Sequence, residues 1–300
     1  MKRLLIFCAA ALLFSSFNIK KKARLKLPQE FVLVPGGTMH VSNTDFSGHD
    51  FDSTKRVSLQ SFYISRVEVS NLQYRQFYNE AVAGFSEGEQ TKIRCDSTGW
   101  RQSISYNEPM VTYYHNHPAY NNYPVVNISQ EGAIEYCRWL QQKLQKENPD
   151  YTIEVKLPAK NEWIWAAQGG RSQAMFPWGN YYLRNKKGEF LCNFKRVGDQ
   201  AITRNRQTGK PEVHEQNIVI TGGLNDRAFY TAAVKSFYPN DFGLYNMCGN
   251  AAEMIAEKGT AMGGSWNDYG GDVQIRAEAR YESPLPTVGF RPIIIVKKTN

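Results

Sequence analysis

The sequence contains few of the residues that build metal centres, and it has no second long apolar run. Its 300 residues include five cysteines and five histidines, with no Cys-x-x-Cys motif or Cys/His spacing typical of zinc sites. Beyond residue 14, no apolar run approaches the ~20 residues that a membrane span requires. The net charge of +8 comes largely from the first 26 residues, and no basic stripe follows them. We therefore expect neither a zinc protein nor a nucleic-acid partner.

The N-terminus resembles an export signal. Lys2 and Arg3 precede an apolar run over residues 4–14, and two small serines follow that run at the expected cleavage position. We therefore predict a signal peptide at residues 1–16, a basic linker at residues 17–30, and an exported protein of the periplasm or outer envelope of a bacterium. The alternative is an uncleaved signal that anchors the protein, so peripheral or anchored membrane association stays open.

Cysteines are scarce beyond the signal, and their pairing is undetermined. An even number in an exported chain permits two disulfides, with three possible connectivities. The four residues concerned are Cys95, Cys137, Cys192 and Cys248. Cys137 falls within a helical pattern, which indicates a small, buried, apolar side chain.

Periodic apolar patterns predict regular elements mainly in the first half of the chain. Residues 31–39 predict a buried strand that runs into a Pro-Gly-Gly turn, and residues 57–70 predict a strand pair. Ser70 begins a helix with a capping-box pattern, a second helix begins after Ser129, and a short third helix follows Pro158.

The second half of the chain has a different character. Residues 183–230 show almost no periodicity, and a structureless stretch of that length is uncommon unless something such as a metal ion holds it. Aromatic residues make up 13% of the sequence, which favours a loop-rich fold in which large flat side chains fill the space between irregular segments.

Nine short motifs follow one another in a characteristic order. They are VPGGTM, FYISRVEVSNLQYRQF, HPAYNNYPVVNIS, EYCRWL, LPAKNEWIWAAQGG, FPWGN, FGLYNMCGNAAEM, GGSW and VGFRP. Together they resemble the formylglycine-generating enzyme (sulfatase-modifying factor) family from about Phe31 to Val296. The resemblance implies an α+β fold, a single irregular, C-type-lectin-like domain with little regular secondary structure. We assign this domain to residues 31–300.

The resemblance fails at the catalytic cysteines. Enzymes of this family place two cysteines shortly after the GGS motif, where they bind copper and activate oxygen to convert a substrate cysteine to formylglycine. Here the corresponding segment, residues 263–280, has no cysteine, and Asp268 and Val273 fall nearest the two positions. Copper(I) selects soft thiolate ligands, which a carboxylate and a valine do not replace. We therefore expect no copper, no catalytic residues of this kind and no formylglycine-generating activity.

Histidine gives no better candidate for a metal centre. Related iron enzymes, which make sulfur-containing histidine derivatives, need a cluster of histidines. His115 and His117 lie two residues apart in an irregular, Tyr-rich segment, which is a weak pattern for a metal site. We interpret both as surface or packing residues.

The resemblance also implies calcium. Family members hold one ion with an Asn side chain, an Asp side chain and two carbonyls, and a second ion around a GN-x-x-E motif. The residues at the matching positions are Asn193, Phe194, Asp226 and Ala228 for the first ion and Gly249, Ala251 and Glu253 for the second. Calcium takes roughly six to eight oxygen ligands, which irregular loops supply well. The alternative is that Asn193 and Asp226 are ordinary turn residues.

Two classes of function stay open. The first is a non-catalytic structural or binding protein of the cell envelope, with other envelope proteins as its partners. The segment from Tyr106 to Val126 resembles a stretch of cysteine-lacking family members associated with gliding motility and type IX secretion. The second is an enzyme of the same superfamily with altered, cysteine-independent chemistry, metal-dependent or not, using carboxylates such as Asp268, Asp272 and Glu278. We favour the first class, because charged residues on a short strand usually form a solvated face.

Overall fold

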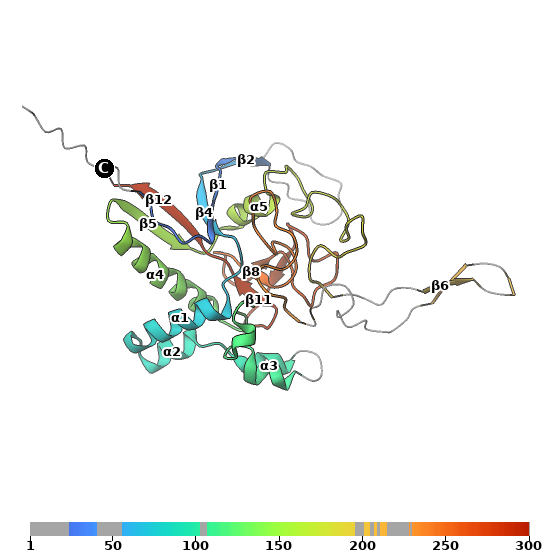
Figure 1. The fold of residues 1–300 in the computed structure, drawn as a ribbon, viewed down its shortest axis with the longest axis horizontal. Helices are drawn as coiled ribbons and strands as arrows, with labels where there is room; N and C mark the ends of the chain where they lie inside the picture. The colour runs from blue at the N-terminus through green and yellow to red at the C-terminus, as the bar shows by residue number, and fades with distance from the viewer. Residues whose placement is uncertain are drawn as a thin grey trace, which may run out of the picture.

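Two four-stranded sheets, two short hairpins and five α-helices make up the described part of the protein (Figure 1). The structure is a computed structural model that describes residues 24–40, 56–102, 107–195, 201–204, 207–208, 211–214, 228 and 230–299. The signal peptide predicted at residues 1–16 and the predicted calcium ligand Asp226 lie outside these ranges. No helix within them is both long and apolar enough to traverse a lipid bilayer.

The first sheet brings the two ends of the domain together. Its strands lie in the order β1, β4, β12 and β5, and all neighbours are antiparallel. Their bounds are Phe31–Val34 for β1, Phe62–Ser65 for β4, Ile293–Lys298 for β12 and Tyr151–Lys156 for β5. Because β12 lies between β4 and β5, the last strand of the chain completes a sheet that the first half begins.

The helices confirm the three that the sequence predicts and add two short ones. Their bounds are Asn71–Ala81 for α1, Glu87–Ile93 for α2, Glu108–Tyr113 for α3, Gln130–Glu147 for α4 and Lys160–Gln168 for α5. At the start of α1, the N–H and hydroxyl of Ser70 donate to Oε1 of Gln73 at 2.9 and 3.1 Å, so the capping box is present. Ser129 caps α4 by accepting from the N–H of Gly132 at 2.9 Å.

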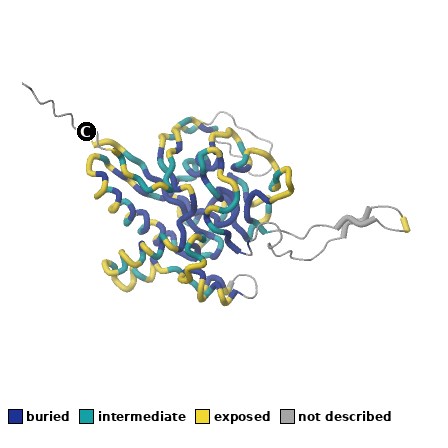
Figure 2. Tube along the Cα trace, viewed as in Figure 1, coloured by how far each residue is buried: buried dark blue, intermediate teal, exposed yellow. Residues whose placement is uncertain are grey.

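The first sheet separates two apolar cores, because alternate side chains of a strand point to opposite faces. Ile64 of β4 packs with Trp163 of α5 in one core. Ile294 of β12 packs with Tyr74 of α1 and Leu140 of α4 in the other. Figure 2 shows the buried residues along the sheets and on the inner sides of these helices.

The second sheet carries the motifs of the second half of the chain. Its strands lie in the order β10, β9, β8 and β11, with β11 parallel to β8 and the other pairs antiparallel. Their bounds are Glu278–Arg280 for β10, Thr260–Met262 for β9, Ala252–Met254 for β8 and Val288–Phe290 for β11. Between α5 and β8, the described residues form only one regular unit, the hairpin of β6 (Ala201–Arg204) and β7 (Pro211–His214). The expected irregularity is confirmed for the described residues of this stretch.

The strand predictions need one correction. Residues 57–70 do contain two strands, but β4 pairs with β1, and β3 (Arg56–Leu59) pairs with β2 (Gly37–His40). The two strands therefore belong to different sheets and do not pair with each other. Residues 60 and 61, which belong to neither strand, separate them.

None of the four cysteines within the described ranges forms a disulfide in this structure. Cys137 is buried in the core around α4, as the helical pattern predicts. Burial raises the pKa of Cys95 to about 12, so its thiol stays protonated at neutral pH.

Candidate functional site

A tight turn follows β9 and carries the GGSW motif. Gly263 and Gly264 have φ angles of +86° and +67°, which side chains rarely allow. A Cβ on Gly264 would lie 2.4 Å from the carbonyl oxygen of Asp272 and 2.9 Å from the Cα of Val273. The turn therefore presses the segment after β9 against residues 272–273, and this fixes the geometry of the positions where family enzymes carry cysteines.

Asp268, nearest the first of those positions, caps the turn. Its Oδ2 accepts hydrogen bonds from the N–H of Ser265 at 2.8 Å and from the Ser265 hydroxyl at 2.6 Å. Its backbone carbonyl accepts from the N–H of Lys195 at 2.8 Å, which ties the turn to the residues after Asn193. The carboxylate thus holds the backbone of its own turn.

Val273, nearest the second position, belongs to the core. Its side chain is fully buried and packs in an apolar cluster with Phe176 and Cys192. A buried valine offers neither a proton nor a lone pair. The two positions that bind copper in the enzymes are thus taken here by a turn cap and a core residue.

Two cysteines from other segments, Cys192 and Cys248, lie close to this place. A Cβ on Gly249 would lie 3.2 Å from the Cβ of Cys192, so Cys192 and Cys248 belong to neighbouring backbone segments. Burial, and then the nearby Cys192 thiol, raise the pKa of Cys248 well above its ordinary value. Because the thiolate is the nucleophile and metal ligand, burial keeps Cys248 in its inert form.

The carboxylates of the alternative enzymatic hypothesis do not converge. Asp268 caps its turn, Asp272 is exposed, and Glu278 of β10 forms an ion pair with Lys160 at the start of α5. His117 accepts from the N–H of Ala119 through Nδ1 at 3.2 Å. Within the described ranges, no three His, Cys, Asp or Glu side chains gather as a metal-binding group.

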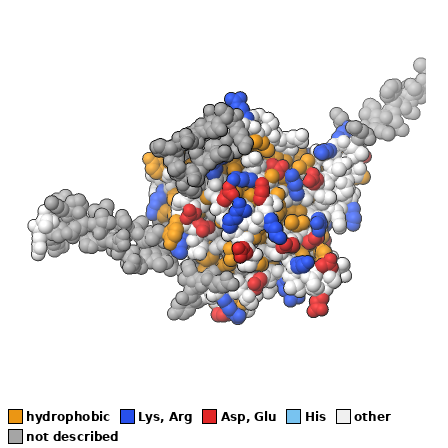
Figure 3. Space-filling model, turned by 180° about the vertical axis from the view of Figure 1, so that it is seen from behind, with side chains coloured by type: hydrophobic (Ala, Val, Ile, Leu, Met, Phe, Trp, Pro, Cys, Tyr) orange, Lys and Arg blue, Asp and Glu red, His pale blue; other side chains and the backbone are white. Residues whose placement is uncertain are grey.

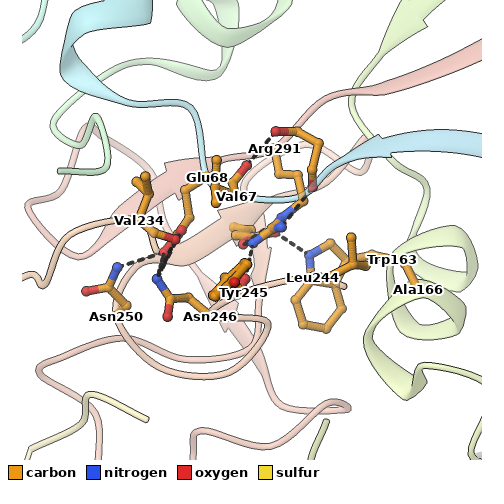
Figure 4. A network of polar contacts seen from close by, with 12 residues as sticks. Val67, Glu68, Trp163, Ala166, Val234, Leu244, Tyr245, Asn246, Asn250 and Arg291 are labelled. Atoms are coloured by element: carbon orange, nitrogen blue, oxygen red, sulfur yellow. Dashed lines mark hydrogen bonds and ion pairs between the residues drawn. The ribbon is translucent and has the colours of Figure 1, made fainter. Parts of the chain in front are cut away.

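A fully buried ion pair joins the two sheets (Figure 4). Arg291, which precedes β12, places Nε 3.0 Å from both carboxylate oxygens of Glu253 and Nη2 2.6 Å from Oε1. The indole of Trp163 donates to Oε2 of Glu253 at 2.7 Å. The terminal nitrogens of Arg291 also donate to the carbonyls of Ser65 at 2.9 Å and Tyr245 at 2.7 Å. Both charged groups are therefore surrounded by complementary partners.

A second buried carboxyl, that of Glu68, lies in the same network without a guanidinium bound to it (Figure 4). Asn250 donates to its Oε1 at 2.7 Å, and Asn246 lies 3.2 Å from both oxygens. Burial raises the pKa of Glu68 to about 8; the charge of Arg291 opposes this shift, and the charge of Glu253 adds to it. At neutral pH the Glu68 carboxyl is therefore mostly protonated.

Asn250 connects this network to the irregular segments. Its Oδ1 accepts from the N–H of Ala232 at 2.6 Å and from Nδ2 of Asn193 at 3.4 Å. Asn193 also donates to the carbonyl of Tyr230 at 2.6 Å, and its own carbonyl accepts from the N–H of Asn250 at 2.8 Å. A Cβ on Gly249 would lie 2.3 Å from the Asn193 carbonyl oxygen, so this glycine allows the close approach.

The structure brings parts of the two predicted calcium sites together. Asn193 of the first set lies against Gly249 of the second. Ala228 and Ala251 are buried and Phe194 is half-buried, whereas Asp226 lies outside the described residues. The carboxylate of Glu253 already accepts hydrogen bonds from Arg291 and Trp163. A calcium ion at the second set would therefore compete with a bound guanidinium.

Sequence analysis misses three residues of the network: Glu68, Asn246 and Arg291. Each lies inside a motif of the resemblance, namely FYISRVEVSNLQYRQF, FGLYNMCGNAAEM and VGFRP. The sequence gives only a weak signal for Glu68, which stands between Val67 and Val69 but close to the polar Ser65 and Arg66. The Oδ1 atom of Asn246 is buried and has no hydrogen-bond partner among the described residues.

Comparisons with known proteins agree with this architecture. The family described as "Sulfatase-modifying factor enzyme 1-like domain" matches residues 16–295. The formylglycine-generating enzyme of Thermomonospora curvata is 26% identical over 270 residues, which cover 80% of this chain and 75% of that enzyme. The inactive C-alpha-formylglycine-generating enzyme 2 of Bos taurus is 26% identical over 266 residues, 79% of this chain and 76% of that protein. The crystal structure of CarF superposes with a TM-score of 0.58 at 20% identity, over 91% of this chain and 99% of that chain, which shows a common fold.

Proposed function

This chain belongs to the sulfatase-modifying factor enzyme 1-like family, and we propose that it is a non-catalytic binding or structural protein of the cell envelope. The observation that carries the proposal is the structural use of Asp268 as a turn cap and Val273 as a core residue. Copper-dependent formylglycine formation needs thiolates at these positions. A fold does not by itself imply an activity, because function resides in the site.

The relatives support this proposal without deciding it. The bovine relative named as inactive and the bacterial relative named as an enzyme are equally similar to this chain, at 26% identity each. Overall similarity therefore does not separate the active from the inactive state. The local roles of Asp268 and Val273 are the better criterion.

The surface supports protein partners. Tyr181, Tyr182 and Tyr238 are 75%, 72% and 62% exposed, and exposed tyrosines are common anchors in protein interfaces. Figure 3 shows Lys and Arg side chains interspersed with Asp and Glu on the face drawn, with apolar side chains between them. Because charges of both signs are mixed there, that face has no uniformly positive surface for a nucleic acid to bind. The proposed partners are other envelope proteins.

The proposal of an envelope location rests on the N-terminal signal pattern. Export to the periplasm or outer envelope predicts that the native protein fractionates with the envelope and begins after residue 16. Mass measurement of the purified native protein checks the cleavage. A protein found with its intact N-terminus in the cytoplasmic fraction contradicts export.

Gliding motility and type IX secretion are a narrower form of the same proposal. Their support is the segment from Tyr106 to Val126. In its described part, Tyr114 is fully buried and its ring lies 4.7 Å from that of Trp100. Core packing therefore accounts for part of the resemblance in this segment. The narrower proposal is tested only by identifying the partner protein.

Crosslinking in intact cells tests the binding role. A photoreactive residue at position 182 is expected to capture an envelope protein, because Tyr182 is highly exposed. The matched control carries the same group at position 186, at the exposed Lys186 of the same irregular segment. Capture at 182 and not at 186 supports a defined interface. Capture of no envelope protein from either position contradicts this role.

Calcium completes the proposal. We place it at the first set, where Asn193 and Asp226 would supply side-chain oxygens and Phe194 and Ala228 would supply carbonyls. These are hard oxygen ligands of the kind that calcium prefers. The ion would hold together irregular segments that otherwise depend on a few hydrogen bonds.

A further inference from the structure

The chain before β1 is fixed to one end of the domain. Asn148, which is buried and follows α4, accepts from the N–H of Lys26 through Oδ1 at 2.7 Å and donates to the carbonyl of Lys26 through Nδ2 at 2.9 Å. Leu25 and Leu27, on either side of Lys26, pack against the core of α4 and β5. Because both backbone groups of Lys26 are bound, the described chain begins at this end of the domain.

The last strand of the chain ends at the same place. Lys298, the last residue of β12, lies opposite Tyr151, the first residue of β5, and the N–H of Thr299 donates to the carbonyl of Asp150 at 3.1 Å. Figure 1 shows the C-terminus where β12 ends beside β5. Nε2 of Gln145, in the last turn of α4, donates to the carbonyl of Tyr151 at 2.7 Å. Three segments that are far apart in the sequence therefore meet at this end.

Each of these three segments carries exposed basic side chains. They are Arg24 and Lys26 before β1, Lys146 on α4, and Lys297 and Lys298 on β12. We call these five residues the basic end. None of them forms an ion pair with a carboxylate that the structure describes. The exposed Glu147 and Asp150, in the turn between α4 and β5, offset two of the five positive charges.

The sequence adds further charge next to the basic end. Lys20, Lys21 and Lys22 precede Arg24 closely, and the apolar run over residues 4–14 ends ten positions before Arg24. Because an extended chain spans at most roughly 3.3–3.6 Å per residue, the chain itself keeps that run within about 35 Å of the basic end until a signal peptide is removed. The apolar run and the basic side chains can therefore reach the same surface.

We propose that the basic end docks on a bilayer surface of anionic phospholipid. The inference rests on the envelope location proposed above and names the surface on which the protein lies there. Basic side chains are attracted to anionic headgroups, and each Lys or Arg near the surface raises the affinity about fivefold. A bilayer also accepts the apolar run where the signal is retained, whereas a nucleic acid or an acidic protein offers nothing to that run.

This orientation leaves the irregular half of the molecule accessible. In Figure 1, the irregular segment of residues 170–195 lies on the opposite side of the molecule from the end of β12. A domain docked through its basic end therefore holds that segment, with its exposed tyrosines, away from the bilayer and open to partner proteins.

Co-sedimentation of the purified mature protein with vesicles tests the proposal. One set of vesicles contains equal parts of phosphatidylglycerol and phosphatidylcholine, and the other contains phosphatidylcholine alone. We expect binding to the anionic vesicles to be at least ~25-fold tighter in 0.1 M salt, since two lysines at the surface already supply that factor. The preference should disappear in ~1 M salt, where the Debye length falls from ~10 Å to ~3 Å. Equal binding to both sets in low salt, or no binding to either, overturns the proposal.

A double variant tests the folded surface itself. Lys146→Gln/Lys298→Gln removes two exposed charges from segments that only the fold brings together, and it should weaken binding to anionic vesicles by ~25-fold. The matched control Lys186→Gln/Lys187→Gln removes two exposed charges from the irregular segment on the opposite side. It should bind like the wild type. Equal weakening in the two double variants would show an effect of net charge alone and overturn the assignment to the basic end.

A triple variant separates the folded surface from the chain before it. Lys20→Gln/Lys21→Gln/Lys22→Gln should weaken binding, and Lys146→Gln/Lys298→Gln should weaken it further when the two sets are combined. If the triple variant loses all preference for anionic vesicles and Lys146→Gln/Lys298→Gln loses none, the folded end is not a docking surface and the proposal is overturned.

The vesicle experiment fails independently of the envelope role. It uses purified protein and lipid, without a partner protein and without cell fractionation. A protein that fractionates with the envelope but shows no preference for anionic vesicles contradicts lipid docking and leaves the envelope role intact. A protein that prefers anionic vesicles but stays in the cytoplasmic fraction supports the docking surface and contradicts the envelope location.

Discussion

The turn after β9 and the network behind β8 use their polar groups in opposite ways. In the turn, the partly exposed carboxylate of Asp268 accepts hydrogen bonds from Ser265, three residues away in the sequence. In the network, Glu253, Arg291 and Glu68 are fully buried and connect segments far apart in the sequence. At the position of the family's catalytic cysteine, the side chain therefore stabilises only its own turn. The buried charged groups behind β8, in contrast, connect distant segments.

This difference indicates what holds the irregular half of the molecule together. Between α5 and β8 the described chain has little regular structure, so few ladder hydrogen bonds fix its course. Asn193, Asn250 and Arg291 instead satisfy backbone carbonyls and amides of separate loops. Side-chain contacts to the backbone therefore perform the role that sheets perform elsewhere.

Removal of the arginine should have the largest effect on the network. Arg291→Met leaves the Glu253 carboxylate buried without its cation, and we expect a loss of ~3–5 kcal/mol in the free energy of unfolding. The double variant Glu253→Gln/Arg291→Met removes both charges and should lose less. Urea unfolding measures both. If Arg291→Met is as stable as the double variant, the unpaired Glu253 carboxylate does not lower the free energy of unfolding as expected.

Glu68 should make the stability of the protein depend on pH. Its folded-state pKa is raised from 4.5 to about 8, so the folded protein retains a proton that the unfolded chain has already lost. Stability should therefore fall as pH rises from about 4.5 to about 8 and should not change further above that, by roughly 4 kcal/mol in total.

The variant Glu68→Gln isolates this effect. It should match the wild type near pH 5 and become more stable than the wild type by roughly 4 kcal/mol at pH 9, because the amide has no charge to bury. Urea unfolding over this pH range measures the difference between the two proteins. A difference that does not vary with pH contradicts the burial of an ionisable Glu68.

Local signals allowed much of the fold to be predicted. The capping pattern at Ser70 and the apolar stripe after Ser129 are short-range features, and both helices form as expected. The pairing of β3 with β2 could not be foreseen, because it depends on contacts outside residues 57–70. The α2 and α3 helices are too short to produce a clear apolar period.

The candidate site was predictable in outline only. The absence of cysteine near Asp268 and Val273 is visible in the sequence, but the turn-capping and core roles of these residues are not. The ion pair between Glu253 and Arg291 spans 38 positions, and the contact between Glu68 and Asn250 spans 182. No periodicity or spacing rule connects residues at such separations, so only the folded structure brings them together.

Calcium that binds at the first set should stabilise the folded protein. At a hundredfold excess over the dissociation constant, an ion that binds only the folded state adds ~2.7 kcal/mol. Asn193→Ala should abolish this increment while Lys186→Ala, in an exposed part of the same segment, preserves it. Thermal unfolding with calcium and with chelator measures the increment. Equal gains for Asn193→Ala and the wild type would place the ion elsewhere.

Asp268 should show the smallest effect. Asp268→Ala removes two hydrogen bonds to Ser265 and should cost about 1–2 kcal/mol. Asp268→Asn keeps an acceptor oxygen and should restore most of that loss. Urea unfolding distinguishes the two. If Asp268→Asn is as destabilised as Asp268→Ala, the charge and not the acceptor matters, and the turn-cap role is wrong.

The most direct test of the central claim is turnover of a cysteine-containing sulfatase peptide. The mature protein is incubated with the peptide, copper(I), a thiol reductant and oxygen, and the peptide mass is followed for conversion of cysteine to formylglycine. The Thermomonospora curvata relative serves as the positive control, and heat-treated protein serves as the blank. Because a turn cap and a buried valine occupy the cysteine positions, conversion should equal the blank. Conversion above the blank would show that this chain catalyses the reaction by other groups and would contradict the account.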